Sequence, residues 1–357
     1  MKKLSSKFSS VTKNLVGMES TVAELINSYL GIGNNVCMMG ICGMGGLGKT
    51  TLARAVYDMY SNRFEGSSFI ANVKEKFEKG CMRQLQRQLL EEILEERNTE
   101  IWDIDRGIYK IKSRLRHRKV LLVLDDVNNV DQLKKLAGGS DWFGSGSWII
   151  ITTRDEHVLV EHGVLKIYKP VVLNKDDASK LFCLKAFKSE QPEEGYMQLS
   201  RGVVKYANGL PLALVTLGSF LVGRTEDVWQ STLDSLKKNP KKEIFDILKI
   251  SYDGLEETCK EIFLDIACFF RRWKKDKVIQ ILESCGFDAR MGISVLLDKS
   301  LLTIGNEDDK TLEMHDLLKE MGKKIVKLES CGKLGNQSRL WHVEDLFRVL
   351  QKDSVRT

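Results

Sequence analysis

The stretch CMMGICGMGGLGKTTL, residues 37–52, joins an apolar run, a glycine-rich loop and the start of a helix. The apolar run, residues 36–42, is long enough for a buried strand of a parallel sheet. Residues 43–50 match G-x-x-x-x-G-K-[ST], the pattern of a loop that binds phosphate. The apolar residues that follow share one helical face: Leu52, Ala53, Val56, Tyr57 and Tyr60. We therefore predict a phosphate-binding loop; the alternative is a glycine-rich turn without a ligand.

The residue types of this loop suit phosphate and a metal ion. Its glycines are Gly43, Gly45, Gly46 and Gly48. Glycine adopts backbone angles that other residues avoid, so the loop can turn its N–H groups toward phosphate oxygens. The following helix adds free N–H groups and the positive end of its dipole. Lys49 is expected to reach the β- and γ-phosphates, and Thr50 to bind Mg²⁺.

Composition limits the class of protein. The 357 residues are 43% apolar and 29% charged, which is typical of a well-packed protein of about two or three domains. A net charge of +6 does not by itself indicate a nucleic-acid binder. The apolar runs are too short to span a bilayer, and the first residues lack the apolar core of a secretory signal. The eight cysteines form no C-x-x-C pair, so we expect reduced thiols in a cytoplasmic or nuclear protein, without zinc.

The pattern of apolar residues changes along the chain. Up to about residue 170, expected strands at 36–42, 67–73, 120–124 and 148–152 alternate with helices, which predicts a parallel α/β sheet. Helices dominate residues 171–240 and suggest a small bundle. Residues 241–357 combine further helices with a hairpin (301–304 and 311–314), which suggests a winged helix. We thus expect three domains: 1–170, 171–240 and 241–357.

Two acidic residues follow the apolar run 120–124. Asp125 lies where a phosphate-loop ATPase needs a carboxylate to hold Mg²⁺, at the carboxyl end of a neighbouring strand. Asp126 could orient or deprotonate an attacking water. The alternative for this pair is an acidic strand end or a helix cap.

Thr152, Thr153 and Arg154 end another apolar strand. Ligands of a parallel sheet bind outside the carboxyl ends of its strands. An arginine at that edge can detect a γ-phosphate through charge-assisted hydrogen bonds. The alternative is an arginine on the surface where the strand ends.

Six motifs occur in a fixed order: GMGGLGKTT, KVLLVLDDV, GSWIIITTRD, GLPLAL, FLDIACFF and MHD. In this order they closely resemble the NB-ARC domain of plant nucleotide-binding, leucine-rich-repeat disease-resistance proteins. FEGSSFIANVKE (64–75) and FLDIACFF (263–270) resemble the class that carries a TIR domain. Asn128 also favours that class, since the coiled-coil class usually has tryptophan there. The resemblance covers about residues 14–347.

The resemblance implies a P-loop α/β domain followed by a helical and a winged-helix subdomain. The family is a STAND-class ADP/ATP switch in defence signalling, with slow ATP hydrolysis and self-association on activation. Val16 and Gly17 would lie near the adenine, and Pro211 would pack near it. His315 would contact the β-phosphate of ADP, and Arg154 would sense the γ-phosphate. The residues implied to hold phosphate and metal are Gly46, Leu47, Gly48, Lys49, Thr50 and Thr51.

The chain departs from the family in two respects. Trp148 stands where the family motif GSRIIITTRD has arginine, and we expect a local packing change there rather than lost binding. No TIR-like segment precedes residue 14 and no leucine-rich repeat follows residue 347. We therefore expect a trimmed or short gene product, and signalling and effector recognition are not assigned to this chain alone.

Three other functions remain open at the level of sequence. A metabolic phosphoryl-transfer enzyme would need an acceptor pocket, for which no motif is visible. A DNA-binding regulator could use the winged helix and the basic runs 114–119 and 271–277, but no helix combines exposed arginine with base-reading residues. A scaffold with a vestigial pocket conflicts with the intact set Lys49, Thr50, Asp125 and Arg154.

Overall fold

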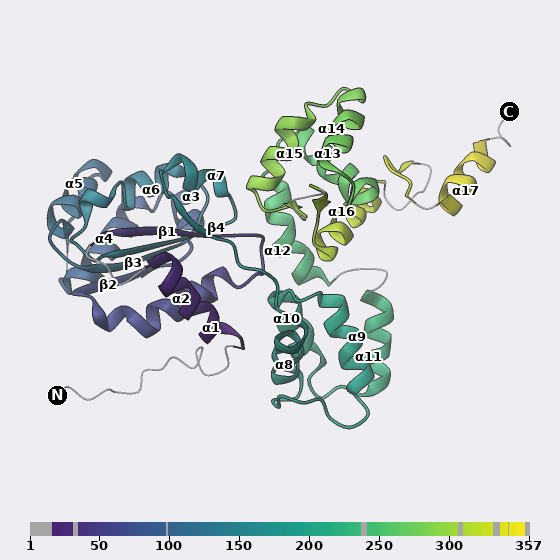
Figure 1. Ribbon diagram of the computed structural model, residues 1–357, viewed down its shortest axis with the longest axis horizontal. Helices are drawn as coiled ribbons and strands as arrows, with labels where there is room; N and C mark the ends of the chain where they lie inside the picture. The colour runs from purple at the N-terminus through teal and green to yellow at the C-terminus, as the bar shows by residue number, and fades with distance from the viewer. Residues whose placement is uncertain are drawn as a thin grey trace. The chain divides into compact units, whose positions relative to one another are not determined.

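A five-stranded parallel sheet forms the first part of the chain in the computed structural model (Figure 1). The structure describes residues 16–30, 35–97, 99–236, 241–305, 310–330, 336–341 and 343–353. The strand order is β2–β3–β4–β1–β5. The strands are β1 (Cys37–Cys42), β2 (Gly66–Ile70), β3 (Val120–Val127), β4 (Trp148–Thr153) and β5 (Lys166–Tyr168). The predicted fold class is therefore confirmed, with β5 as an additional short edge strand.

Helices cover both faces of this sheet because successive side chains of a buried strand point to opposite sides. Leu121 and Val123 of β3 pack toward α1 (Met18–Leu25), the π-helical turn Ile26–Leu30 and α2 (Lys49–Tyr60). Leu122 and Leu124 pack toward the opposite layer. That layer contains α3 (Val73–Glu78), α4 (Met82–Leu94), α5 (Ile104–Leu115), α6 (Val130–Leu136) and α7 (Glu156–Glu161).

Two predicted strand ends were wrong. The second strand stops at Ile70 rather than at 73, because Asn72 turns the chain with a φ of 54° and Val73 begins α3. The third strand continues past Leu124 to Val127, with a register shift against β4 between those two residues. Asp125 and Asp126 therefore lie inside β3 rather than after it.

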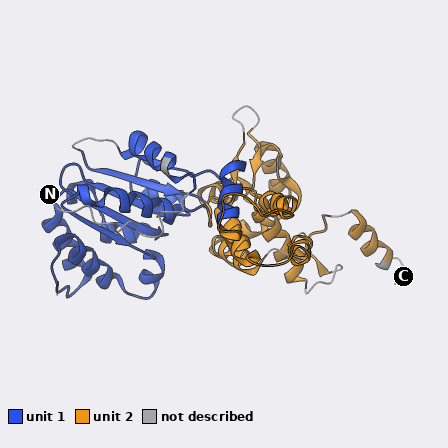
Figure 2. Cartoon of the chain, turned by 90° about the horizontal axis from the view of Figure 1, so that it is seen from below, with its two compact units in different colours: residues 1–43, 47–184 blue, residues 44–46, 185–357 orange. Residues whose placement is uncertain are grey.

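The chain divides into two compact units (Figure 2). The first contains Met1–Gly43 and Leu47–Leu184, and the second contains Met44–Gly46 and Lys185–Thr357. Helix α8 (Lys175–Ala186) crosses the division. None of the described helices is long and apolar enough to cross a membrane.

The second unit is mainly helical. Its first helices are α9 (Met197–Ala207), α10 (Pro211–Leu221) and α11 (Glu226–Leu236). Trp229 of α11 is buried, and its indole N–H donates to Leu221 O at the end of α10 at 3.2 Å. The later helices are α12 (Lys242–Asp253), α13 (Glu257–Asp265), α14 (Lys275–Ser284), α15 (Ala289–Asp298), α16 (Asp316–Glu329) and α17 (Val343–Asp353). After α13 the chain closes as a π-helical turn, Ile266–Phe270, and α17 follows the last described loop.

The predicted hairpin is present but short. Strands β6 (Thr303–Ile304) and β7 (Leu312–Glu313) pair antiparallel, and Lys274 forms a bridge with Thr311. Helix α16 packs directly on the π-helical turn, since a Cβ on Gly322 would lie 2.8 Å from the Ala267 Cβ. The turn between the two strands, residues 306–309, lies outside the described residues.

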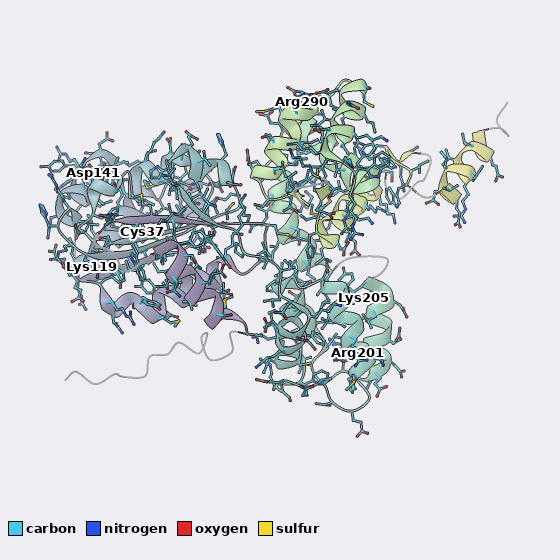
Figure 3. All side chains as sticks on the ribbon, viewed as in Figure 1. Cys37, Lys119, Asp141, Arg201, Lys205 and Arg290 are labelled. Atoms are coloured by element: carbon cyan, nitrogen blue, oxygen red, sulfur yellow. The ribbon has the colours of Figure 1, made fainter. Side chains whose placement is uncertain are left out.

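Trp148 is the centre of an aromatic cluster where the strands begin. Its ring lies 5.5 Å from that of Tyr60 and 5.2 Å from that of Phe64, and only 8% of the residue is exposed. Cys37 pairs with it in the ladder, and Lys119 lies over the Phe64 ring. Figure 3 labels Cys37 and Lys119 at this end of the sheet, opposite the end where the glycine loop leaves β1. The departure from the family motif thus changes packing at a place remote from the predicted site.

Candidate functional site

The glycine loop connects β1 to α2 as the sequence predicted. Gly46 and Gly48 have φ values of 85°, in the left-handed region that only glycine enters at low cost. A Cβ on Gly43 would lie 2.8 Å from the Leu47 side chain, so the loop folds closely on itself. Helix α2 begins at Lys49 with Gly48 as its cap, which directs its free N–H groups toward the loop.

Lys49 is buried inside this loop. Only 8% of the residue is exposed, and its Nζ donates to Gly43 O at 2.7 Å. Burial and then the positive charge of Arg154 lower the pKa of Lys49 to about 8, although Asp126 and Asp125 act in the opposite direction. A desolvated cation beside a glycine loop is well suited to bind phosphate, because phosphate charge is attracted more strongly where water is excluded.

Thr50 and Asp125 meet beside the loop. The Thr50 hydroxyl donates to Asp125 Oδ1 at 2.7 Å, and Asp125 is only 2% exposed. A hydroxyl and a carboxylate are hard oxygen donors of the kind that Mg²⁺ prefers. Among the described residues no group of three or more His, Cys, Asp or Glu could hold a metal ion. Mg²⁺ held here would therefore need phosphate and water as its remaining ligands, which is how it usually binds.

Asp126 and Arg154 form an ion pair at the same edge of the sheet. Arg154 Nε lies 3.7 Å from Asp126 Oδ1, and both side chains are partly exposed. Asp126 has a φ of 57°, and its N–H donates to the Thr152 hydroxyl at 2.9 Å. The predicted role of Asp126 toward water stays a prediction. In this structure its carboxylate contacts the arginine expected to sense phosphate.

The start of α1 lies near the loop, and two predicted site residues, Val16 and Gly17, come just before it. Gly17 has a φ of 71° and precedes α1, and the hydroxyl of Thr21 donates to Gly17 O at 3.0 Å. A Cβ on Gly48 would lie 3.7 Å from the Met18 side chain. Met18, the residue after Gly17, is thus the one that the structure places beside the glycine loop. The contact of Val16 and Gly17 with adenine stays a prediction.

Four of the predicted site residues belong to the second compact unit. These are Gly45, Gly46, Pro211 and His315. Met44–Gly46 belong there because Leu212 N–H donates to Gly46 O at 3.1 Å. Pro211 begins α10 immediately before Leu212. The predicted contacts of Pro211 with adenine and of His315 with phosphate stay predictions.

His315 is engaged through both ring nitrogens within the second unit. Its Nδ1 accepts a hydrogen bond from Leu317 N–H at 3.2 Å and caps α16. Its Nε2 lies 3.1 Å from Asn208 O, which can only accept, so Nε2 carries the proton. The neutral ring therefore fits this site, and burial lowers the pKa of His315 below its usual value.

The neighbouring Asp316 also contacts Asn208 and adds one further residue, Arg271. Its Oδ2 accepts from Asn208 Nδ2 at 3.0 Å, and its Oδ1 forms an ion pair with Arg271. We call His315, Asp316, Asn208 and Arg271 the Asn208 cluster. It joins the end of α9, the π-helical turn and the start of α16. The sequence did not reveal Asn208 or Arg271, because they lie 108 and 45 residues from Asp316 and no local pattern links such distant positions.

The state of His315 predicts a pH dependence of stability. Burial lowers the pKa of His315 in the folded chain. As pH falls below the ordinary value of about 6.5, the imidazole is therefore protonated first in the unfolded chain. The neutral His315 ring therefore contributes to the stability of the folded chain above that value, and this contribution is lost as pH falls toward the folded pKa. Protonated Nδ1 also cannot cap α16, and a lost cap costs about 1 kcal/mol. Asp316 and Arg271 are the charged groups that face the ring.

We expect the free energy of unfolding in urea to fall between about pH 7.5 and about pH 5.5, by roughly 1 kcal/mol more in the native chain than in His315→Asn. Asparagine keeps a side-chain cap for α16 but does not titrate. An equal fall in both chains would contradict this prediction.

The fold and this site define a class of protein: one with the fold and the phosphate-loop motif of P-loop nucleotide-binding proteins. Residues 18–192 match the model of the NB-ARC domain. Residues 256–330 match the winged-helix domain of Roq1-like disease-resistance proteins. The chain therefore belongs to the NB-ARC family of plant disease-resistance proteins. The resemblance drawn from its motifs, including the TIR class, is confirmed.

Similar proteins extend over nearly the whole chain. TMV resistance protein N of Nicotiana glutinosa is 44% identical over 353 residues, which cover 97% of this chain and 30% of that protein. Disease resistance protein RUN1 of Vitis rotundifolia is 42% identical over 338 residues, which cover 94% of this chain and 25% of that protein. The chain thus spans less than a third of the length of these relatives.

Solved structures support the fold alone. A Walker-type ATPase of Pyrococcus abyssi, PABY2304, matches with a TM-score of 0.57 and 12% identity, covering 87% of this chain and 97% of that one. The ORC2 protein of Aeropyrum pernix, solved as ADPNP–ADP complexes, matches with a TM-score of 0.51 and 12% identity. The match covers 89% of this chain and 96% of that one.

Proposed function

We propose that this chain is a nucleotide switch that binds ADP or ATP with Mg²⁺ and hydrolyses ATP slowly. The observation that carries the proposal is the arrangement of Lys49, Thr50, Asp125 and Arg154 around one glycine loop. A lysine, a hydroxyl, a buried carboxylate and an arginine at the carboxyl ends of parallel strands are the groups needed to hold a nucleoside polyphosphate.

Each group has a distinct role in this proposal. The loop N–H groups and Lys49 hold the phosphates, and Thr50 and Asp125 hold Mg²⁺, which neutralises charge on the phosphate oxygens when it is bound. Arg154 detects the γ-phosphate and exchanges its contact with Asp126 for one with phosphate. Such a group distinguishes ATP from ADP, because only ATP offers the additional charge.

The regulation rests on the remaining predictions. We assign residues 1–170 to the P-loop domain, 171–240 to a helical subdomain and 241–357 to a winged-helix subdomain. ADP would favour one arrangement of these parts through Pro211 and His315, and ATP another, since a ligand shifts an equilibrium by its difference in affinity for the two states. In the full-length receptors this switch would act in intracellular defence signalling and control self-association.

Analysis of the bound nucleotide tests this function first. The purified chain is denatured, and the supernatant is separated by anion-exchange chromatography. Stoichiometric ADP, or an empty chain that binds ATP with Mg²⁺, supports a nucleotide switch. An empty chain that binds neither ADP nor ATP contradicts it.

DNA binding receives less support from the structure. In the basic run 271–277, Arg271 pairs with Asp316, Arg272 Nε lies 3.7 Å from Glu313 Oε2, and Lys277 lies over the Trp273 ring. Each of these contacts competes with phosphate for the cation, whereas DNA binding depends on Lys and Arg that neutralise phosphates. We therefore do not propose DNA binding for this chain.

A further inference from the structure

The buried hydroxyl of Thr152 lies between two consecutive acidic residues of β3. Thr152 is 1% exposed, and its Oγ1 donates to Asp125 Oδ1 at 2.6 Å. The same oxygen accepts the N–H of Asp126 at 2.9 Å. A hydroxyl has one proton and two lone pairs, so these two contacts fix its orientation.

The contact with Asp125 fixes the carboxylate expected to bind Mg²⁺. Two hydroxyls, from Thr50 and Thr152, donate to the same Oδ1. Thr50 turns toward the metal in the proposed site, whereas Thr152 approaches from the neighbouring strand. Thr152 can therefore keep the carboxylate oriented while Thr50 acts as a ligand.

The contact with Asp126 supports an unusual backbone turn. A φ of 57° is unfavourable for a residue other than glycine and needs support from its surroundings. At this point the β3–β4 ladder shifts register between Leu124 and Val127. The Thr152 hydroxyl accepts the Asp126 N–H within this irregular segment, and the turn places the Asp126 carboxylate 3.7 Å from Arg154 Nε.

We propose that Thr152 is a positioning residue of the nucleotide site, which orients Asp125 for Mg²⁺ and, through the turn at Asp126, Arg154 for the γ-phosphate. This inference rests on the proposed function. It adds that one side chain joins the metal-binding and phosphate-sensing halves of the site. Thr152 itself touches neither metal nor nucleotide in this proposal.

The test compares Thr152→Val with Thr152→Ser in the full chain. Valine keeps the shape but removes donor and acceptor, whereas serine keeps both. The dissociation constants of ATP and ADP are measured by titration calorimetry, with Mg²⁺ and with EDTA. In Thr152→Val we expect the gain in ATP affinity from Mg²⁺ to fall by about 10- to 100-fold, as is typical when a residue that orients a metal ligand is removed. Thr152→Ser should restore it, and ADP binding in EDTA should be nearly unchanged.

Ser147 offers a matched control at the other end of the same strands. It is fully buried, donates to Gly144 O at 2.6 Å and accepts Val120 N–H at 2.9 Å. Ser147→Ala therefore removes a buried hydroxyl that pins β3 beside β4, but away from the loop. It should lower stability in urea and leave the effect of Mg²⁺ unaltered.

The outcomes separate this inference from the function beneath it. A folded Thr152→Val chain that keeps the full Mg²⁺ effect overturns the inference alone, as does an equal loss of affinity with and without Mg²⁺. If Thr152→Val does not fold, Thr152→Cys, with its weak S–H donor, should lose part of the Mg²⁺ effect, and an undiminished effect overturns the inference. A native chain that binds no nucleotide overturns the proposed function and this inference with it.

Discussion

Replacing Lys49 with alanine should abolish nucleotide binding. The Lys49 ammonium lies inside the glycine loop, where its Nζ donates to Gly43 O at 2.7 Å, and no other lysine of the loop could replace it. A hydrogen bond to a charged group contributes about 1.5–3 kcal/mol. Two such bonds to the β- and γ-phosphates would contribute at least about 3 kcal/mol, so we expect ADP and ATP affinity to fall by more than about 100-fold.

Titration with a fluorescent ADP analogue measures this loss. Lys166→Ala is the matched control, because Lys166 lies in the same compact unit and its Nζ also donates to a backbone carbonyl, that of Tyr29, at 2.6 Å. Circular dichroism of both variants checks that they fold. Unchanged affinity in a folded Lys49→Ala chain would disprove the phosphate-loop assignment.

Replacing Asp316 with valine should release ADP faster, because it removes the carboxylate that contacts both Arg271 and Asn208. Arg271 is left without its carboxylate, although its side chain is only 17% exposed, and Asn208 loses its acceptor. Breaking a fully buried ion pair costs about 3–5 kcal/mol. The Asp316 side chain is 45% exposed, so solvent screening reduces the expected cost to about 1–2 kcal/mol. If the ADP-bound arrangement depends on this cluster, ADP release should accelerate by about 5- to 30-fold.

Stopped-flow displacement of the fluorescent ADP measures the release rate. Asn208→Ala, which keeps the Arg271–Asp316 pair, should accelerate release less than Asp316→Val. Glu313→Ala removes the pair with Arg272 on the exposed hairpin and should have no effect. An unaltered release rate in Asp316→Val would show that the cluster does not hold the ADP-bound state.

The strands with long apolar runs were predictable because burial on both faces requires such runs. Residues 148–152 are one example, and they form most of β4. The strand β5 was missed because it has only three residues at the sheet edge, two of which are not buried. The extension of β3 past Leu124 was also missed. It depends on the turn at Asp126, which the Thr152 hydroxyl supports from a strand some 25 residues further along the chain.

The candidate site was predictable where its residues are local in sequence. Gly43 to Thr50 form one continuous motif, and Asp125 and Arg154 each end an apolar run. The functions of Thr152, Asn208 and Arg271 were not predictable, because each depends on a partner brought close only by folding. For Thr152 the sequence did contain a sign of such a partner, because a polar residue near the end of a buried apolar strand needs a hydrogen-bond partner.

The pairing of β1 has a consequence for the order in which a ribosome can complete this domain. The strand that carries the glycine loop pairs only with β4 and β5 among the described strands, and both are encoded far downstream. At about 5–20 residues per second, β1 therefore emerges several seconds before residues 148–153 can pair with it. During that interval its apolar residues and backbone N–H groups remain exposed to chaperones and to other nascent chains. A nascent chain that stalls before residue 148 would hold a complete glycine motif without the sheet that supports it.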